Sequence, residues 1–311
     1  MSILRLFTGS IKFIIINSMN KFIKYILIFL LFPFTLFGQT QDSTAILNKE
    51  DNLADLFKRV TIYRSEKEIL DAIDKIPPFG IYKDNFFITG IPLNQKITNN
   101  TADAMFQISI RHRLTKSILP FGTFAYLTYT QKSFWNIYAE SSPFRDTNYN
   151  PGIGLAKVIL HKNRLLGVAF IQIKHESNGR EKEESRSWNY LSLAAKYYIN
   201  PQFNISGEFW LPYVDGDNNK DLLDYKGLGQ INVSLTDARQ KWWLEMQLNQ
   251  RKGFGNINTI ASIAFKVSKS SNQYLFLRFQ DGYGDSLLDY NKYSMNVRIG
   301  MCIKPDFYSI Y

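Results

Sequence analysis

The sequence predicts an all-β fold: a transmembrane antiparallel β-barrel of about 12 strands with a short N-terminal extension. From about residue 85 onward, apolar and polar side chains alternate, which indicates strands with one apolar and one mostly polar face. The longest apolar stripes cover roughly 9–11 residues, the length of a tilted strand that crosses a bilayer. The polar faces carry Arg, Glu, Gln and Asn at mid-strand, which suits a watery lumen.

Residues 1–38 are predicted to be a secretory signal peptide, with Met19 as an alternative start. Lys21 and Lys24 make its beginning basic, and the apolar core at 25–34 is shorter than the ~20 residues of a transmembrane helix. The alternative is an N-terminal membrane anchor. No apolar run of about 18 residues follows, so a helical membrane protein is not expected.

Residues 39–80 are predicted to form an N-terminal periplasmic extension. This stretch is polar and helical in pattern, with a candidate helix at 66–73 that Pro77 and Pro78 would stop. Residues 81–311 are then expected to form the transmembrane barrel domain.

Clear alternation marks the strands of this domain. Val297 and Ile299, for example, oppose Asn296 and Arg298. Turn signals rich in Gly, Pro, Asn and Asp separate many of the strands, at residues 148–151, 161–163, 200–201, 215–220, 252–255 and 281–284. A soluble sandwich would alternate in the same way locally. The predicted export signal and the polar mid-strand faces favour a closed barrel, which leaves no strand edge in hydrocarbon.

The composition narrows the choice of partners. The net charge of the 311-residue chain is +10, but its Lys and Arg residues are dispersed, so a nucleic-acid partner is not expected. A basic surface beside anionic lipid heads, or a basic lumen, explains the excess of positive charge at least as well as a nucleic-acid partner would. The single cysteine, Cys302, excludes an intrachain disulfide.

His175, Ser177 and Asn189 are the candidate catalytic residues. In an extended strand His175 and Ser177 share one face, and Asn189 extends the apolar face of the next strand. A hairpin would bring His175 and Asn189 opposite each other, within hydrogen-bonding reach. Ser177 would be the nucleophile, His175 the base and Asn189 the residue that orients the imidazole.

The outward, apolar side of the barrel is an unusual place for such groups unless the substrate is itself a lipid. Taken alone, a His-x-Ser pair often arises by chance. His112 and His161 have no such neighbours, and no zinc-type spacing links the histidines.

Three blocks of sequence, at residues 129–149, 175–189 and 281–291, resemble bacterial outer membrane phospholipase A, of the phospholipase A1 family. The resemblance covers roughly residues 84–307. It implies an outer-membrane barrel that hydrolyses acyl esters of phospholipids and lysophospholipids, uses calcium and is active as a homodimer.

The resemblance also implies roles for residues around the triad. The N–H of Gly179 would contribute to an oxyanion hole. Calcium would be held by the Arg180 carbonyl, the Ser185 hydroxyl and the carbonyl of the partner subunit's Ser141. The alternative for Ser185 is a plain loop serine. The nearby glutamates at 181, 183 and 184 would either be solvated or strengthen calcium binding.

The sequence therefore predicts a calcium-dependent phospholipase A of the bacterial outer membrane. Its substrates would be phospholipids in the surrounding outer membrane. Two alternatives are kept, both with an inactive barrel: a passive pore, and an adhesin that acts through its loops.

Overall fold

The computed structural model describes residues 66–162, 164–214, 216–268 and 272–305. The predicted signal peptide at 1–38 and the first part of the predicted extension, 39–65, lie outside these residues. No helix in the described ranges is long and apolar enough to cross a membrane.

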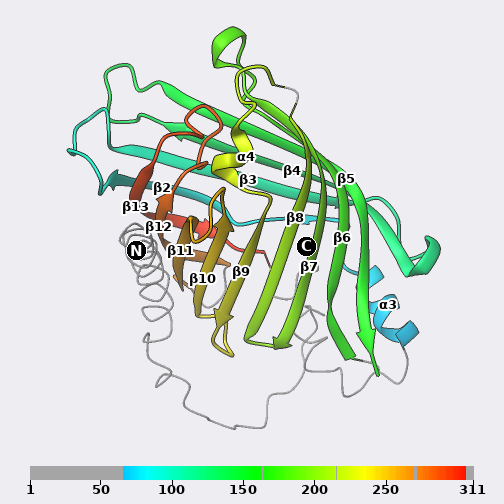
Figure 1. Cartoon of the computed structure of the whole chain (residues 1–311). Helices are drawn as coiled ribbons and strands as arrows, with labels where there is room; N and C mark the ends of the chain where they lie inside the picture. Colours follow the sequence, from blue (N-terminus) through cyan, green and yellow to red (C-terminus); the bar gives the residue numbers. More distant parts are fainter. Residues whose placement is uncertain (1–65, 163, 215, 269–271, 306–311) are drawn as a thin grey trace, which may run out of the picture.

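Twelve strands, β2 to β13, close into one antiparallel barrel (Figure 1). Each strand pairs with the next in sequence, and β13 pairs with β2 to complete the ring. The strands are β2 (Asn85–Pro92), β3 (Asp103–Arg113), β4 (Thr123–Trp135), β5 (Phe144–His161), β6 (Arg164–Ser177), β7 (Ser187–Asn200), β8 (Phe203–Tyr213), β9 (Gly229–Thr236), β10 (Trp242–Gln250), β11 (Ile257–Lys266), β12 (Gln273–Gly282) and β13 (Ser294–Ile303). The predicted fold class and strand number are confirmed.

Three smaller elements complete the described chain. The helix α3 (Glu66–Asp74) matches the predicted helix and is followed by β1 (Phe79–Ile81), which pairs with β3. The helix α4 (Leu222–Lys226) lies between β8 and β9. The two helices lie toward opposite ends of the barrel (Figure 1). We call the end with α3 the turn end, because the short connections from β5 to β6 and from β7 to β8 are there, and the end with α4 the loop end.

The strand alternation separates two chemically different faces of the wall. Ile173 in β6 and Leu211 in β8 are exposed on the outside, whereas Gln172 and Ser192 are buried on the lumen side. The outer face is therefore an apolar surface for lipid, as the period of two predicted.

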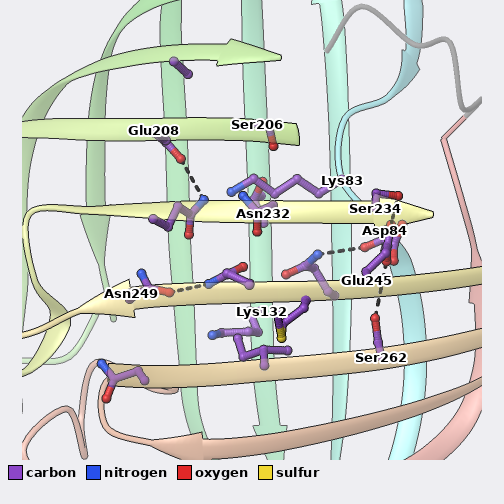
Figure 2. A pocket seen from close by; sticks show the side chains of 18 of the residues that line it. Lys83, Asp84, Lys132, Ser206, Glu208, Asn232, Ser234, Glu245, Asn249 and Ser262 are labelled. Carbon is purple, nitrogen blue, oxygen red and sulfur yellow. Dashed lines mark hydrogen bonds between the residues drawn. The ribbon is translucent and has the colours of Figure 1, made fainter. Parts of the chain in front are cut away.

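Ion pairs line the lumen face of the wall. Arg298 binds Asp103 through two hydrogen bonds of 2.7 and 2.8 Å, and Lys174 binds Glu208 at 3.1 Å. The lumen holds a cavity of about 450 Å³, and Figure 2 shows polar side chains that line it, among them Glu208, Lys132 and Glu245. Burial alone would raise the pKa of Asp285, in the loop after β12, but Arg278 and other nearby cations hold it below its usual range. The charges in the lumen are thus largely compensated by one another.

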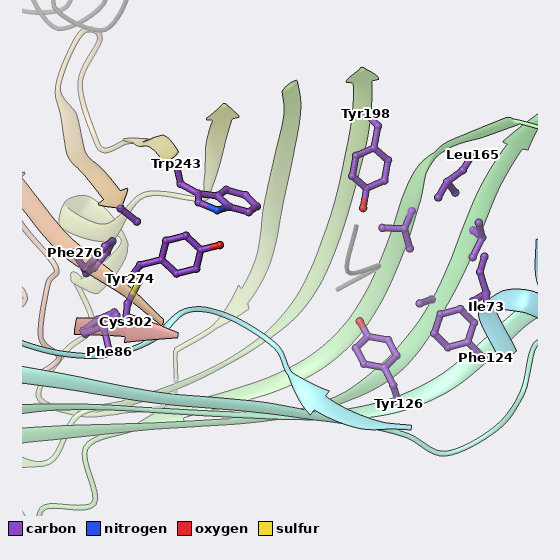
Figure 3. Packing of buried hydrophobic residues seen from close by; sticks show 14 of the residues in the cluster. Ile73, Phe86, Phe124, Tyr126, Leu165, Tyr198, Trp243, Tyr274, Phe276 and Cys302 are labelled. Atoms are coloured by element: carbon purple, nitrogen blue, oxygen red, sulfur yellow. The ribbon is translucent and has the colours of Figure 1, made fainter. Parts of the chain in front are cut away.

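An apolar cluster fills the turn end, and α3 contributes to it. Ile69 and Ile73 of α3 are fully buried in the cluster that also contains Phe124 and Tyr126 (Figure 3). The guanidinium of Arg113 donates hydrogen bonds of 2.9 Å to the carbonyls that end the helix, those of Ile73, Asp74 and Ile76. Apolar packing and a C-terminal cap together hold α3 on the barrel.

One predicted turn is wrong. Residues 148–151 lie inside β5, with Pro151 opposite Tyr129 of β4. The ladder between β5 and β6 is interrupted beside Pro151, which has no N–H to donate. The side-chain amide of Asn150 instead donates to the carbonyl of His175 at 2.8 Å. Continuous pairing with β4, and pairing with β6 at Tyr149 and Gly152, therefore overrides the local turn signal.

Candidate active site

The strands β6 and β7 form the hairpin that carries the candidate triad at the loop end. Their register places His175 opposite Asn189 and Ser177 opposite Ser187. The Nδ1 atom of His175 and the Oδ1 atom of Asn189 are 2.8 Å apart. A carboxamide oxygen only accepts hydrogen bonds, so Nδ1 carries the proton and Nε2 is left as the basic nitrogen.

The three side chains lie on the outer face of the wall. His175 and Ser177 continue the stripe of exposed Ile171 and Ile173, and all three candidates are half-buried. Within the described residues, the Ser177 hydroxyl makes no hydrogen bond to the His175 ring. Catalytic hydrogen bonds in ligand-free enzymes often form only when substrate binds, so this arrangement is compatible with nucleophile and base.

The loop after β6 presents Gly179 in a conformation that other residues rarely adopt. Its φ is +64°, and a Cβ atom there would lie 3.1 Å from the Tyr149 ring. The Asn178 side chain holds the loop by accepting from the Arg186 N–H at 3.0 Å and donating to the Glu184 carbonyl at 2.8 Å. Among the described residues nothing accepts from the N–H of Gly179. This N–H is therefore a free donor two residues after Ser177.

The same loop contains two of the predicted calcium ligands. In the described part of the chain, the Arg180 carbonyl and the Ser185 hydroxyl have no hydrogen-bond partner. No group of three or more His, Cys, Asp or Glu residues there is arranged to hold a metal. The guanidinium of Arg180 pairs with Glu184. Neutral, hard oxygen donors of this kind fit Ca²⁺, which takes carbonyl and hydroxyl ligands.

Ser141, the third predicted ligand, lies in another loop, between β4 and β5. It is exposed and has a φ of +62°, and the next residue, Ser142, also has a positive φ of 41°. The Trp135 indole donates to the Ser142 carbonyl at 2.7 Å and the Ser142 hydroxyl donates to the Ile137 carbonyl at 3.0 Å. These bonds hold the left-handed turn and present Ser141 at its tip.

Sequence reasoning missed the polar groups on the lumen side of the hairpin. Glu176 and Trp188 point inward between the candidate residues, and Lys226 of α4 reaches them. Alternation indicated their orientation, but nothing local in the sequence linked them to one another.

A sequence model of the phospholipase A1 family matches residues 88–303. The chain belongs to this family. It is 30% identical over 211 residues to phospholipase A1 of Salmonella typhimurium, and the match covers 66% of this chain and 71% of that protein. It is also 30% identical over 214 residues to a putative phospholipase A1 of Neisseria meningitidis. That match covers 64% of this chain and 54% of the relative, so the chain spans about half of the relative's length.

Solved structures agree with the fold of this family member. Outer membrane phospholipase A from Escherichia coli superimposes with a TM-score of 0.65 at 24% identity, over 73% of this chain and 99% of that one. A Salmonella typhi outer membrane phospholipase dimer with bound calcium superimposes with a TM-score of 0.64 at 26% identity. The match covers 74% of this chain and 94% of that one. The predictions of a phospholipase family, an enzyme and a bacterial outer-membrane location are confirmed.

Proposed function

We propose that this phospholipase A1 family member hydrolyses acyl esters of phospholipids and lysophospholipids, with Ser177 as nucleophile, His175 as base and Asn189 as orienting residue. The observation that supports it best is the 2.8 Å hydrogen bond between His175 and Asn189 on the apolar outer wall. Outer-membrane barrels usually place their longer loops outside the cell, so the loop end would reach lipids of the outer leaflet.

The chemistry follows from the geometry. The Ser177 hydroxyl attacks the ester carbonyl while Nε2 of His175 takes its proton, which gives a tetrahedral oxyanion. The free N–H of Gly179 donates to this oxyanion. The imidazolium then returns the proton to the departing alkoxide, and water activated by His175 hydrolyses the acyl-enzyme in the same way.

Asn189 suits a site beside hydrocarbon. Its amide holds the His175 tautomer that leaves Nε2 basic, and it carries no charge. A carboxylate would stabilise the imidazolium better, but an ionised group next to lipid costs more free energy to bury.

Calcium would be held by the Arg180 carbonyl and the Ser185 hydroxyl, with the carbonyl of the partner subunit's Ser141 in an active homodimer. When bound there, the ion would polarise the ester carbonyl and stabilise negative charge. The bound calcium and the dimeric state of the Salmonella typhi structure support this assignment.

The alternative of an inactive pore finds little support in the lumen. Ion-paired charges line it, and α3 packs into the apolar cluster at the turn end. Conductance across a planar bilayer tests this alternative: a steady open-pore current would favour it.

The decisive experiment compares Ser177→Ala with Ser206→Ala, a lumen-facing serine shown in Figure 2. Release of fatty acid from mixed micelles is measured with calcium present. We expect Ser177→Ala to lose activity by about 10³-fold or more and Ser206→Ala to match the wild type. Undiminished hydrolysis by Ser177→Ala would refute the nucleophile.

A further inference from the structure

A polar cluster lies directly behind the candidate triad, on the lumen face of the same hairpin. Glu176 sits between His175 and Ser177 in β6 and pairs across the sheet with Trp188, the neighbour of Asn189. Its Oε2 atom accepts from the Trp188 indole at 2.8 Å and from the Lys226 ammonium at 2.9 Å. One carboxylate thus joins both strands of the hairpin to α4.

The hydrogen bonds of Glu176 to Trp188 and Lys226 are shielded from water. The Glu176 and Lys226 side chains are only 13% and 17% exposed, and Trp188 is fully buried. The Lys226 ammonium also lies 5.3 Å from the centre of the Trp188 ring, and Tyr190 stacks on that ring at 4.0 Å. A charge-assisted hydrogen bond in such surroundings resists displacement more than one in water.

A third contact that holds the hairpin from behind comes from β5. The Asn150 amide donates to the His175 carbonyl at 2.8 Å and lies 3.0 Å from the Tyr190 hydroxyl. It takes the place of the ladder bond that Pro151 cannot make. On the β5 side, the backbone carbonyl of the proposed base is therefore held by a side chain in place of a ladder bond, while on the other side His175 stays in register with Asn189 of β7.

We propose that Asn150, Glu176, Trp188 and Lys226, here named the lumen clamp, are positioning residues for the triad on the opposite face. The inference rests on the proposed function. Hydrocarbon on the outer face offers no hydrogen bonds to hold the catalytic groups in place. The lumen side is then where polar contacts can keep the hairpin backbone, and with it His175, Ser177 and Asn189, in register.

The test uses the full-length protein refolded in detergent with calcium. The clamp variants are Lys226→Met and Asn150→Ala, with Lys226→Arg as the conservative rescue. Lys304→Met is the matched control, because the ammonium of Lys304 also pairs with lumen carboxylates, those of Asp84 and Glu245, but at the turn end, and its side chain is even more buried than that of Lys226. Gel mobility without heating reports the folded fraction of each variant. The readouts are kcat, KM and the rate at which a small sulfonyl fluoride labels Ser177.

We expect each clamp variant to lose about 10–100-fold in kcat and in labelling rate, with KM changed less than about threefold, since small displacements of catalytic groups have effects of this size. Lys226→Arg should recover most of the loss, and Lys304→Met should keep wild-type values per folded molecule. Clamp variants that react like Lys304→Met would overturn the inference. Ser177→Ala, run in parallel, separates this outcome from failure of the proposed function: if it stays active, the triad itself is wrong.

Discussion

At the scale of single residues, the proposed site has a neutral group, the carboxamide of Asn189, to orient its histidine. The carboxamide of Asn189 meets Nδ1 of His175 at 2.8 Å, on a wall whose neighbouring side chains are isoleucine and leucine. Because a carboxamide is neutral, this position adds no charge to the lipid-facing surface, while the imidazole is still held in one tautomer.

Replacing Asn189 by alanine should lower kcat by about 10²-fold, because the imidazole loses its orienting acceptor. Phospholipid hydrolysis measured at saturating substrate checks this. Asn100→Ala, in an exposed loop, serves as the control and should behave as wild type. An Asn189→Ala variant with full kcat would remove Asn189 from the triad while leaving Ser177 and His175 in place.

At the scale of elements, α3 is the helix of the predicted extension within the described residues. Two fully buried isoleucines and the Arg113 cap hold it at the turn end of the barrel. The strands pair around the ring without it, so the helix should be able to leave while the barrel stays closed.

The substitution Ile73→Asp should release α3, since losing a buried isoleucine costs about 2–5 kcal/mol and an unpaired buried carboxylate adds to this. Trypsin cleavage after Lys67 and Lys75 should then accelerate at least about tenfold, with the barrel still resistant. Asp71→Ala, on the exposed side of the same helix, should leave the rate unchanged. Equal rates in Ile73→Asp and wild type would show that the contact does not hold the helix.

At the scale of the whole molecule, the proposed calcium site would couple activity to association. One barrel offers the Arg180 carbonyl and the Ser185 hydroxyl, and the exposed tip at Ser141 lies on a separate loop. A site with few charged ligands binds calcium weakly, so completion by a second subunit would matter.

Chelation of calcium should therefore abolish hydrolysis and reduce amine crosslinking of the dimer. Ser185→Ala should raise the calcium concentration for half-maximal activity by about tenfold, because one hard oxygen ligand is lost. Activity in a calcium titration, with Ser206→Ala as control, measures this. Hydrolysis that persists in chelator would exclude the ion from the reaction but would leave the triad standing.

The sequence by itself determined the fold class, the orientation of His175 and Ser177 and the family, because side-chain alternation and contiguous motifs are local properties. Only the tertiary structure decided how distant segments meet. Lys226 reaches Glu176 from 50 residues away, and Asn150 replaces the missing donor of Pro151, in a strand where the sequence indicated a turn. The physical reason is that ring closure and register are set by the pairing of all strands together, which no local pattern encodes.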